Sequence, residues 1–299
     1  MAAKDKAVVP EARKDRGPLI QKAAGESWPT LSLSDKFYSV FSFLMLICFI
    51  IPTKILEKLG VKKKKNGRIR EVRKGACWQM RFNDGQCNST ILKGRDDSLL
   101  VFGAFRPLPE TLKNLPGSGK VAVLLLSDEL HETFASEFVE GVTKFQGGQA
   151  PKVVCPEKAR QLVSETVVVS ETWEEWSQKE KDNWGLQSWR DPDATRIGTV
   201  GAFVGNFGDG SAYALQTCGI GNVPFRWDFS LLVRLVFGLR RGLFTMSRVT
   251  WVKNVPKTKA HWDEISEIQN LSLVTFFHGE PLSGTSEEIR KKMKTFQIP

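Results

Sequence analysis

The sequence predicts an α/β fold in which two β-sheets pack face to face and helices cover their outer faces, an αββα sandwich, preceded by one membrane-associated helix. Three observations predict this arrangement. Strands and helices alternate twice between residues 75 and 299, with neighbouring strands in each half. An uncharged apolar stretch, residues 37–51, comes before them. The most basic segment of the chain, residues 54–74, follows that stretch.

The composition divides the chain into four parts. Residues 1–36 contain twelve charged residues and have the polar, proline-containing composition of a flexible tail. Residues 37–56 are predicted to form a transmembrane or membrane-associated helix, residues 57–74 a basic juxtamembrane linker, and residues 75–299 the sandwich domain. The five cysteines are scattered without a C-x-x-C pair, so neither a disulfide framework nor a zinc ribbon is indicated.

The apolar segment is predicted to be a single-pass membrane anchor. About twenty residues, 37–56, cross a hydrocarbon core of roughly 30 Å when Lys54 extends its amine toward the headgroups. Two other interpretations stay open: a buried helix of the soluble fold, and an interfacial helix kinked at Pro52. The side chains expected to contact lipid are Phe37, Phe41, Leu44, Leu46, Phe49 and Ile51.

The net charge of +10 is concentrated beside this segment. Residues 54–74 contain ten Lys and Arg against two Glu, a local net charge of +8. Basic flanks stay on the cytoplasmic, stromal or matrix side of a membrane, so the C-terminal domain is expected on that side. The residues expected to contact anionic headgroups are Lys62, Lys63, Lys64 and Lys65. Because the folded domain carries little of the charge, no nucleic-acid partner is expected.

Apolar periodicity predicts the elements of the domain. In the first half we expect strands at 77–82, 89–94, 98–105, 120–127 and 151–156, with a helix at 131–145 that completes a βαβ unit. In the second half we expect a helix at 157–163, strands at 166–170, 197–205, 211–217 and 271–277, and an amphipathic stretch at 226–242. A capping box of Thr285 and Ser286 with Glu288 predicts the start of a last helix.

Tryptophans and histidines are the residues of this domain that invite a functional interpretation. The segment 173–189 is polar between its tryptophans, which favours a surface helix and loop, with a partner-binding patch as the alternative. His131 follows one expected strand and His278 ends another, where metal ligands are often presented. His261 is expected on an exposed helix face.

Four stretches carry a resemblance to a known family. LLLSDELHETFASEF (124–138), PKVVCPEKAR (151–160), AYALQTCGIGN (212–222) and LVTFFHGEPL (273–282) occur in an order and spacing similar to the metallo-β-lactamase superfamily. More narrowly, they resemble a branch of unknown function found in bacteria and photosynthetic eukaryotes. The resemblance implies an αββα sandwich with a metal site at the ends of its strands.

The family's metal ligands are mostly missing from this chain. The superfamily has an H-x-H-x-D-H loop after one strand, a bridging Asp after another, and a final His followed by Gly. The corresponding positions here hold Asp128, Glu129 and His131, then Cys218, and then His278 with Gly279. The resemblance implies Zn or Fe as the ion of an intact site. Because most of the family's ligand positions hold other residues in this chain, we expect no bound cofactor.

These observations predict a membrane-anchored, catalytically degenerate relative of the family, a pseudoenzyme that serves as an accessory subunit beside integral membrane proteins. A plastid or mitochondrial membrane is the setting that the resemblance suggests. The alternative is a metal-dependent hydrolase with a reduced mononuclear site built from the five candidate ligands. A further alternative is a lipid or hydrophobic-ligand carrier, suggested by the apolar stretch 229–244.

Overall fold

The structure is a computed structural model. It describes residues 66–82, 87–128, 134–195, 199–223, 242–245 and 252–296. The predicted tail and anchor and the lysines 62–65 lie outside these residues, as do Glu129, His131 and most of the stretch 229–244. Within the described ranges, no helix has the length and apolar character needed to cross a bilayer.

Sheet A contains seven strands whose order along the sheet is their order along the chain. The first four strands pair antiparallel with their neighbours. From the fourth strand to the seventh the pairing is parallel, because a helical connection carries the chain back to the starting end of the sheet before each new strand. The strands are β1 (Ile69–Arg73), β2 (Cys77–Phe82), β3 (Cys87–Lys93), β4 (Leu99–Phe102), β5 (Val121–Leu125), β6 (Lys152–Cys155) and β7 (Glu171–Thr172).

Sheet B contains six strands in the order β13-β12-β10-β9-β8, with β11 paired to β10. The central pair, β10 and β12, is parallel, and the other pairs are antiparallel. The strands are β8 (Leu186–Arg190), β9 (Ala202–Asn206), β10 (Ala212–Val223), β11 (Gly242–Thr245), β12 (Leu271–Gly279) and β13 (Leu282–Ser283).

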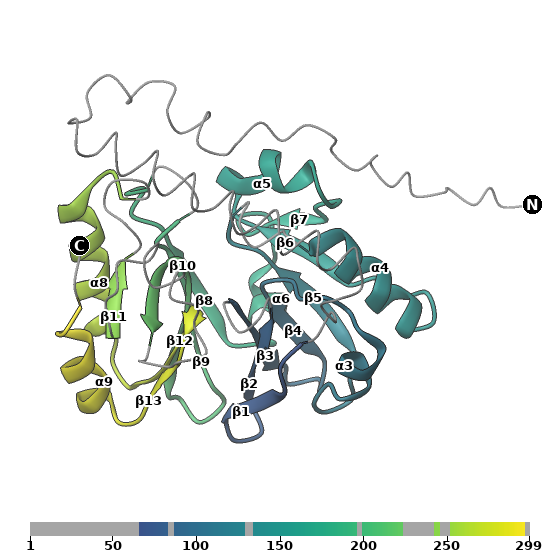
Figure 1. Ribbon diagram of the computed structural model, residues 1–299, viewed down its shortest axis with the longest axis horizontal. Helices are drawn as coiled ribbons and strands as arrows, with labels where there is room; N and C mark the ends of the chain where they lie inside the picture. The colour runs from purple at the N-terminus through teal and green to yellow at the C-terminus, as the bar shows by residue number, and fades with distance from the viewer. Residues whose placement is uncertain are drawn as a thin grey trace, which may run out of the picture.

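Helices cover the outer faces of both sheets (Figure 1). On sheet A these are α3 (Pro109–Lys113), α4 (Ala135–Phe145) and α5 (Glu157–Ser164); on sheet B they are α8 (Val255–Ser266) and α9 (Ser286–Met293); the short α6 (Gln178–Lys181) precedes β8. Apolar side chains of these helices pack into two outer clusters, and a third cluster fills the space between the sheets. The predicted αββα layering of sheets and helices is therefore confirmed.

Several expected elements are present at or near their predicted positions. β5, α4 and β6 form the βαβ unit, and β5 pairs parallel with β6 as that connection requires. The capping box is also confirmed. The Thr285 hydroxyl accepts a hydrogen bond from the Glu288 backbone N–H at 3.3 Å, and the Thr285 N–H donates to the Glu288 carboxylate at 2.8 Å.

Two predictions about residues 166–189 are wrong. The expected strand at 166–170 is irregular: Ser170 donates its backbone N–H to the Val153 carbonyl of β6, but the paired strand itself consists of Glu171–Thr172. Val168 is 64% exposed, so this apolar run is not buried on both faces. The tryptophan-rich segment contains a short helix with exposed residues, Gln178–Lys181, but Trp173, Trp176 and Trp184 are buried in the cluster between the sheets and do not form the alternative partner-binding patch.

The boundary of the basic linker also differs from the prediction. Residues 57–74 were expected to precede the domain, but Ile69–Arg73 form β1 and pair with β2 at the edge of sheet A. A strand fits there because Ile69 and Val72 pack against the two clusters on either side of the sheet. Part of the basic segment therefore belongs to the folded domain.

Candidate functional site

The ends of several strands meet at one edge of the sandwich. The Gly103 N–H, just after β4, donates to the Leu125 carbonyl at the end of β5, at 3.0 Å. The Ser89 hydroxyl on β3 donates to the Gly103 carbonyl at 2.6 Å. The Asn88 carboxamide donates to the Gly279 carbonyl at the end of β12, also at 2.6 Å. These bonds join both sheets at the place where a site presented by strand ends would lie.

Two of the predicted ligands lie near this edge. Asp128 follows β5, is buried, and accepts a hydrogen bond from the Ser127 hydroxyl at 3.2 Å. His278 is the penultimate residue of β12 and is half-buried, with its ring edge-to-face against Phe277 at 5.0 Å between centroids. Asp128 therefore lies just after β5 of sheet A and His278 lies near the end of β12 of sheet B, and the hydrogen bonds above link these two strand ends.

Cys218 lies on β10 in an irregular part of its pairing with β12. Gln216 pairs with Phe276 and Gly221 pairs with His278, so four residues of β10 stand opposite one residue of β12. Such a bulge changes the direction of a strand locally and often occurs beside functional sites. The backbone of Cys218 therefore lies between the two positions at which β10 pairs with the end of β12.

The described donors do not by themselves fit a metal centre. A zinc site takes at least three protein ligands with a few ångströms between them. In the part of the chain that the structure describes, no three His, Cys, Asp or Glu side chains are grouped closely enough to hold an ion. Glu129, His131 and the side chain of Cys218 lie outside that part.

The glycine after His278 has a conformational role. Gly279 has φ = 95°, in the region that residues with a side chain rarely adopt. This turn brings the Glu280 N–H to the Asn222 carbonyl on β10 at 2.7 Å. The Asn222 carboxamide in turn donates to the Glu280 carbonyl at 2.9 Å. The His-Gly pair therefore ends β12 and directs Glu280 toward sheet A.

Replacing this glycine tests the role of the turn. We expect Gly279→Ala to lower the free energy of unfolding by about 1–3 kcal/mol, because a Cβ is strained at this φ. Gly208→Ala is the matched control, since a Cβ there meets open space and φ is not positive. Urea denaturation of both variants measures the difference, and equal stability of the two would contradict the assigned strain.

Glu280 is held by two arginines of sheet A. Its carboxylate forms ion pairs with Arg70 on β1, at 2.7 Å, and with Arg81 on β2. Burial raises the pKa of the Glu280 carboxyl, but hydrogen bonds and charge from Arg70 and Arg81 outweigh burial, so the pKa lies below its usual value. Glu280 therefore stays ionised and links the two sheets.

A small pocket opens beside this ion-pair cluster. It has a volume of about 220 Å³ and is lined by Gly67, Arg68, Arg70, Gln79, Arg81 and Asn88. We call it the arginine pocket. Its side chains from β1, β2 and β3 share the face of sheet A that is turned toward sheet B, because Cys77 and Leu92 on that face belong to the cluster between the sheets.

Two buried carboxamides belong to the lining of the arginine pocket. Gln79 and Asn88 are 4% and 3% exposed. The Asn88 nitrogen donates to the Phe276 carbonyl at 3.0 Å, in addition to Gly279, and the Gln79 nitrogen donates to the same Phe276 carbonyl at 3.4 Å. These hydrogen bonds hold the two carboxamides, and with them the lining of the pocket, against the C-terminal end of β12.

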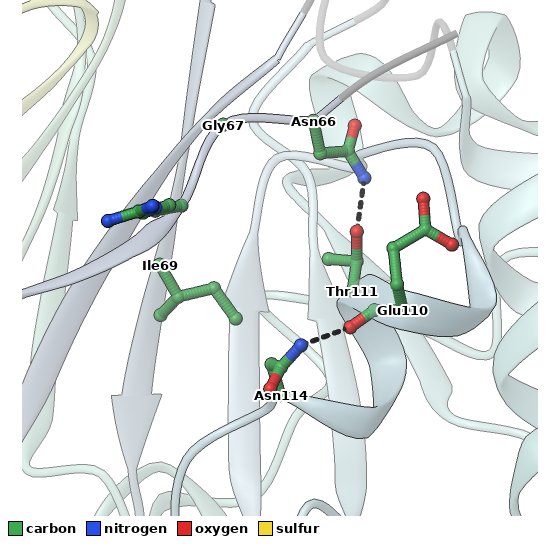
Figure 2. Close-up of a pocket in the computed structure, with 7 residues that line it drawn as sticks. Asn66, Gly67, Ile69, Glu110, Thr111 and Asn114 are labelled. Atoms are coloured by element: carbon green, nitrogen blue, oxygen red, sulfur yellow. Dashed lines mark hydrogen bonds between the residues drawn. The ribbon is translucent and has the colours of Figure 1, made fainter.

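A larger pocket lies on the other side of the Gly67–Arg68 segment. It has a volume of about 650 Å³ and is bounded by the start of β1 and by helix α3. Figure 2 shows Asn66 pointing to Thr111, with its carboxamide 2.9 Å from the hydroxyl, while the Asn114 carboxamide donates to the Glu110 carbonyl at 2.6 Å. Its lining combines polar side chains with the apolar Ile69, and it shares Gly67 and Arg68 with the arginine pocket.

Sequence reasoning missed the arginines of this site. Arg68 and Arg70 were assigned to a linker, and Arg81 to the end of an ordinary strand. A signal was present in the stretch RIREVR (68–73), because basic residues separated by one position share one face of a strand.

The prediction for His261 is wrong. It was expected on an exposed helix face, but it is 3% exposed in α8, beside the buried Trp262. Burial lowers the pKa of its imidazole to about 4. The charge of Asp191 opposes this shift, the charge of Arg190 adds a smaller lowering, and a hydrogen bond with the Val200 backbone opposes it least. His261 is a neutral residue of the interior at physiological pH.

Comparison with known proteins gives distant likenesses in structure and no match to a family model or a curated protein. No protein-family model matches the chain, and no curated protein matches it. Among solved structures, 17 chains match. One is the crystal structure of a Beta-lactamase domain protein from Burkholderia ambifaria, which is 13% identical, has a TM-score of 0.44, and aligns over 77% of this chain and 71% of its own.

Proposed function

We propose that this chain is a membrane-anchored protein of the metallo-β-lactamase type whose metal site is degenerate, and that it serves as an accessory subunit beside integral membrane proteins. The order of the elements supports the family assignment. Asp128 follows β5, Cys218 lies in the bulge of β10, and His278 ends β12, the order in which the superfamily presents its ligands. The apolar stretch 37–51 and its basic flank support the anchor.

The charge beside His278 carries the proposal of a degenerate site. Two residues after His278, Glu280 already neutralises part of the charge of Arg70 and Arg81. Arg68 lines the same pocket, so the group keeps two uncompensated positive charges. A divalent cation is electrostatically disfavoured in such surroundings, whereas an anion is favoured.

The supply of imidazoles also supports a degenerate site. The chain has three histidines in total. His261 is part of α8 on the outer face of sheet B. Dinuclear hydrolytic centres of this superfamily use more imidazoles than His131 and His278 provide. Fold similarity without the ligands does not confer activity.

Metal analysis of the purified full-length chain tests the proposal. We expect far less than one Zn or Fe per chain, and the same melting temperature with and without a chelator, because no ion contributes to folding. His278→Ala is expected to leave the metal content unchanged.

The opposite outcome favours a hydrolase. The position of Asp128 just after β5 and of His278 near the end of β12, at strand ends that hydrogen bonds link, is the observation that supports this second candidate. About one tightly held Zn or Fe per chain, lost in His278→Ala but retained in His261→Gln, would replace the accessory role with a mononuclear metal-dependent hydrolase.

A further inference from the structure

We propose that the arginine pocket binds a phosphate group with two negative charges, as carried by inorganic phosphate or by a phosphomonoester. The proposal goes beyond the accessory role and does not depend on the membrane anchor. It follows from the charge, the donors and the size of the pocket.

The charge of the pocket matches a dianion. Arg68, Arg70 and Arg81 contribute three positive charges, and Glu280 contributes one negative charge. The internal carboxylate therefore leaves a charge of +2. A ligand with one carboxylate would neutralise one of the two remaining positive charges, whereas a phosphate dianion would neutralise both.

Many N–H donors remain after the ion pairs with Glu280. Arg70 and Arg81 each donate through Nη2 to the Glu280 carboxylate. A guanidinium has five N–H donors in a planar fork that suits phosphate oxygens, so each of these arginines keeps others for a ligand. Arg68 makes no hydrogen bond or ion pair with a described residue, so its whole fork remains for a ligand.

The pocket is held in shape by its buried lining. Gln79 and Asn88 are more than nine-tenths buried and are tied to backbone carbonyls at the end of β12. The Gly67 N–H also donates to the Arg81 carbonyl at 2.6 Å, which fixes the Gly67–Arg68 segment against β2. Preorganised donors reduce the entropy cost of binding.

The size of the pocket selects a small group. A volume of about 220 Å³ is below the range of roughly 300–1,000 Å³ that is typical for whole drug-sized ligands. A phosphate group fits this space.

Isothermal titration of the full-length chain in detergent, with inorganic phosphate as the probe, tests the proposal. Chelator is present throughout, and chloride keeps the ionic strength constant. We expect saturable binding of about one phosphate per chain. We expect the double variant Arg68→Gln/Arg70→Gln to bind at least about tenfold more weakly, since charge-assisted bonds are lost.

Two further variants make the test specific. Arg73→Gln is the matched control, because Arg73 lies on the same strand but donates to Asp209 and Ser211 instead of lining the pocket. Its affinity for phosphate should be unchanged. Glu280→Gln releases both guanidinium groups and should bind phosphate several-fold more tightly. This gain cannot result from misfolding.

Absence of saturable binding would overturn the proposal, as would equal losses in Arg73→Gln and in the double variant. The two proposals can fail separately. The titration is done with chelator present, so a metal found by metal analysis of the purified chain would overturn the accessory function but would leave the measured phosphate binding unchanged.

Vesicles distinguish the two sources of phosphate. Phosphatidic acid carries a phosphomonoester headgroup, whereas phosphatidylglycerol carries a phosphodiester. If the ligand is a lipid, the chain binds phosphatidic acid vesicles more tightly at equal surface charge, and inorganic phosphate competes for this binding. If the ligand is soluble, both vesicles bind equally and the titration with inorganic phosphate remains saturable.

Discussion

Phe203→Ala is expected to lower the free energy of unfolding by about 3–5 kcal/mol. Phe203 on β9 is fully buried between the sheets. Its ring centroid lies 5.7 Å from Phe102 of sheet A, 5.0 Å from Trp173 and 4.3 Å from Trp189. Truncation removes these contacts and leaves a cavity that three rigid rings cannot fill by relaxation. Urea denaturation measures the effect as a lower midpoint at an unchanged slope.

Phe145→Ala is the matched control for this substitution. Phe145 ends α4 and is 45% exposed, so the same change in residue type should alter the free energy of unfolding by less than about 0.5–1 kcal/mol. Similar losses in both variants would contradict the tight packing assigned to Phe203 between the sheets.

Local patterns were sufficient to predict much of the architecture. The continuous apolar run that became β5, the helical spacing of Phe138 and Val142 in α4, and the strand β6 each have one strong local signal. The capping box of Thr285 and Glu288 is read directly from residue types three positions apart. In these elements, local preference and tertiary burial agree.

The tryptophan-rich segment shows where local patterns fail. Its polar residues suggested a surface, yet Trp173 and Trp176 pack edge-to-face at 5.9 Å inside the molecule. Lys181 lies over the Trp173 ring at 4.5 Å, and the Tyr213 hydroxyl donates to the Trp184 carbonyl at 2.6 Å. Tyr213 and Phe203, which also contacts Trp173, come from strands of sheet B, so only the assembled sheets determine that the segment is buried.

Part of the candidate site could also be predicted from local patterns. Asp128 follows the strand β5 and His278 lies near the end of β12, positions that the apolar pattern of each strand indicates. The arginine pocket required more information. Arg70 and Arg81 become neighbours only because β1 pairs with β2 in the register that places Arg70 opposite Gln79. That register cannot be read from a segment whose composition indicates a basic linker.

Acid is expected to destabilise this protein through His261. The imidazole has its ordinary pKa of 6.5 in the unfolded chain and a pKa of about 4 in the fold, where burial disfavours its charged form. Below pH 6.5 the unfolded chain binds a proton that the folded chain does not, so stability is complete above that pH and decreases as the pH falls toward 4. We expect a loss of about 2 kcal/mol between pH 7 and pH 5 from this residue alone.

His261→Gln isolates this contribution, because a carboxamide can retain a hydrogen bond with the Val200 backbone and does not titrate. The free energy of unfolding of this variant should change little between pH 7 and pH 5. His278→Gln, which keeps the buried imidazole of α8, should retain the full loss. The interval stays above pH 5 because the Glu280 and Asp209 carboxyls, whose pKa values are lowered by their arginine and serine partners, begin to contribute in more acidic solution. If His261→Gln keeps the loss of stability, the proton is taken up elsewhere in the unfolded chain, and the buried environment of α8 does not set the acid limit of the fold.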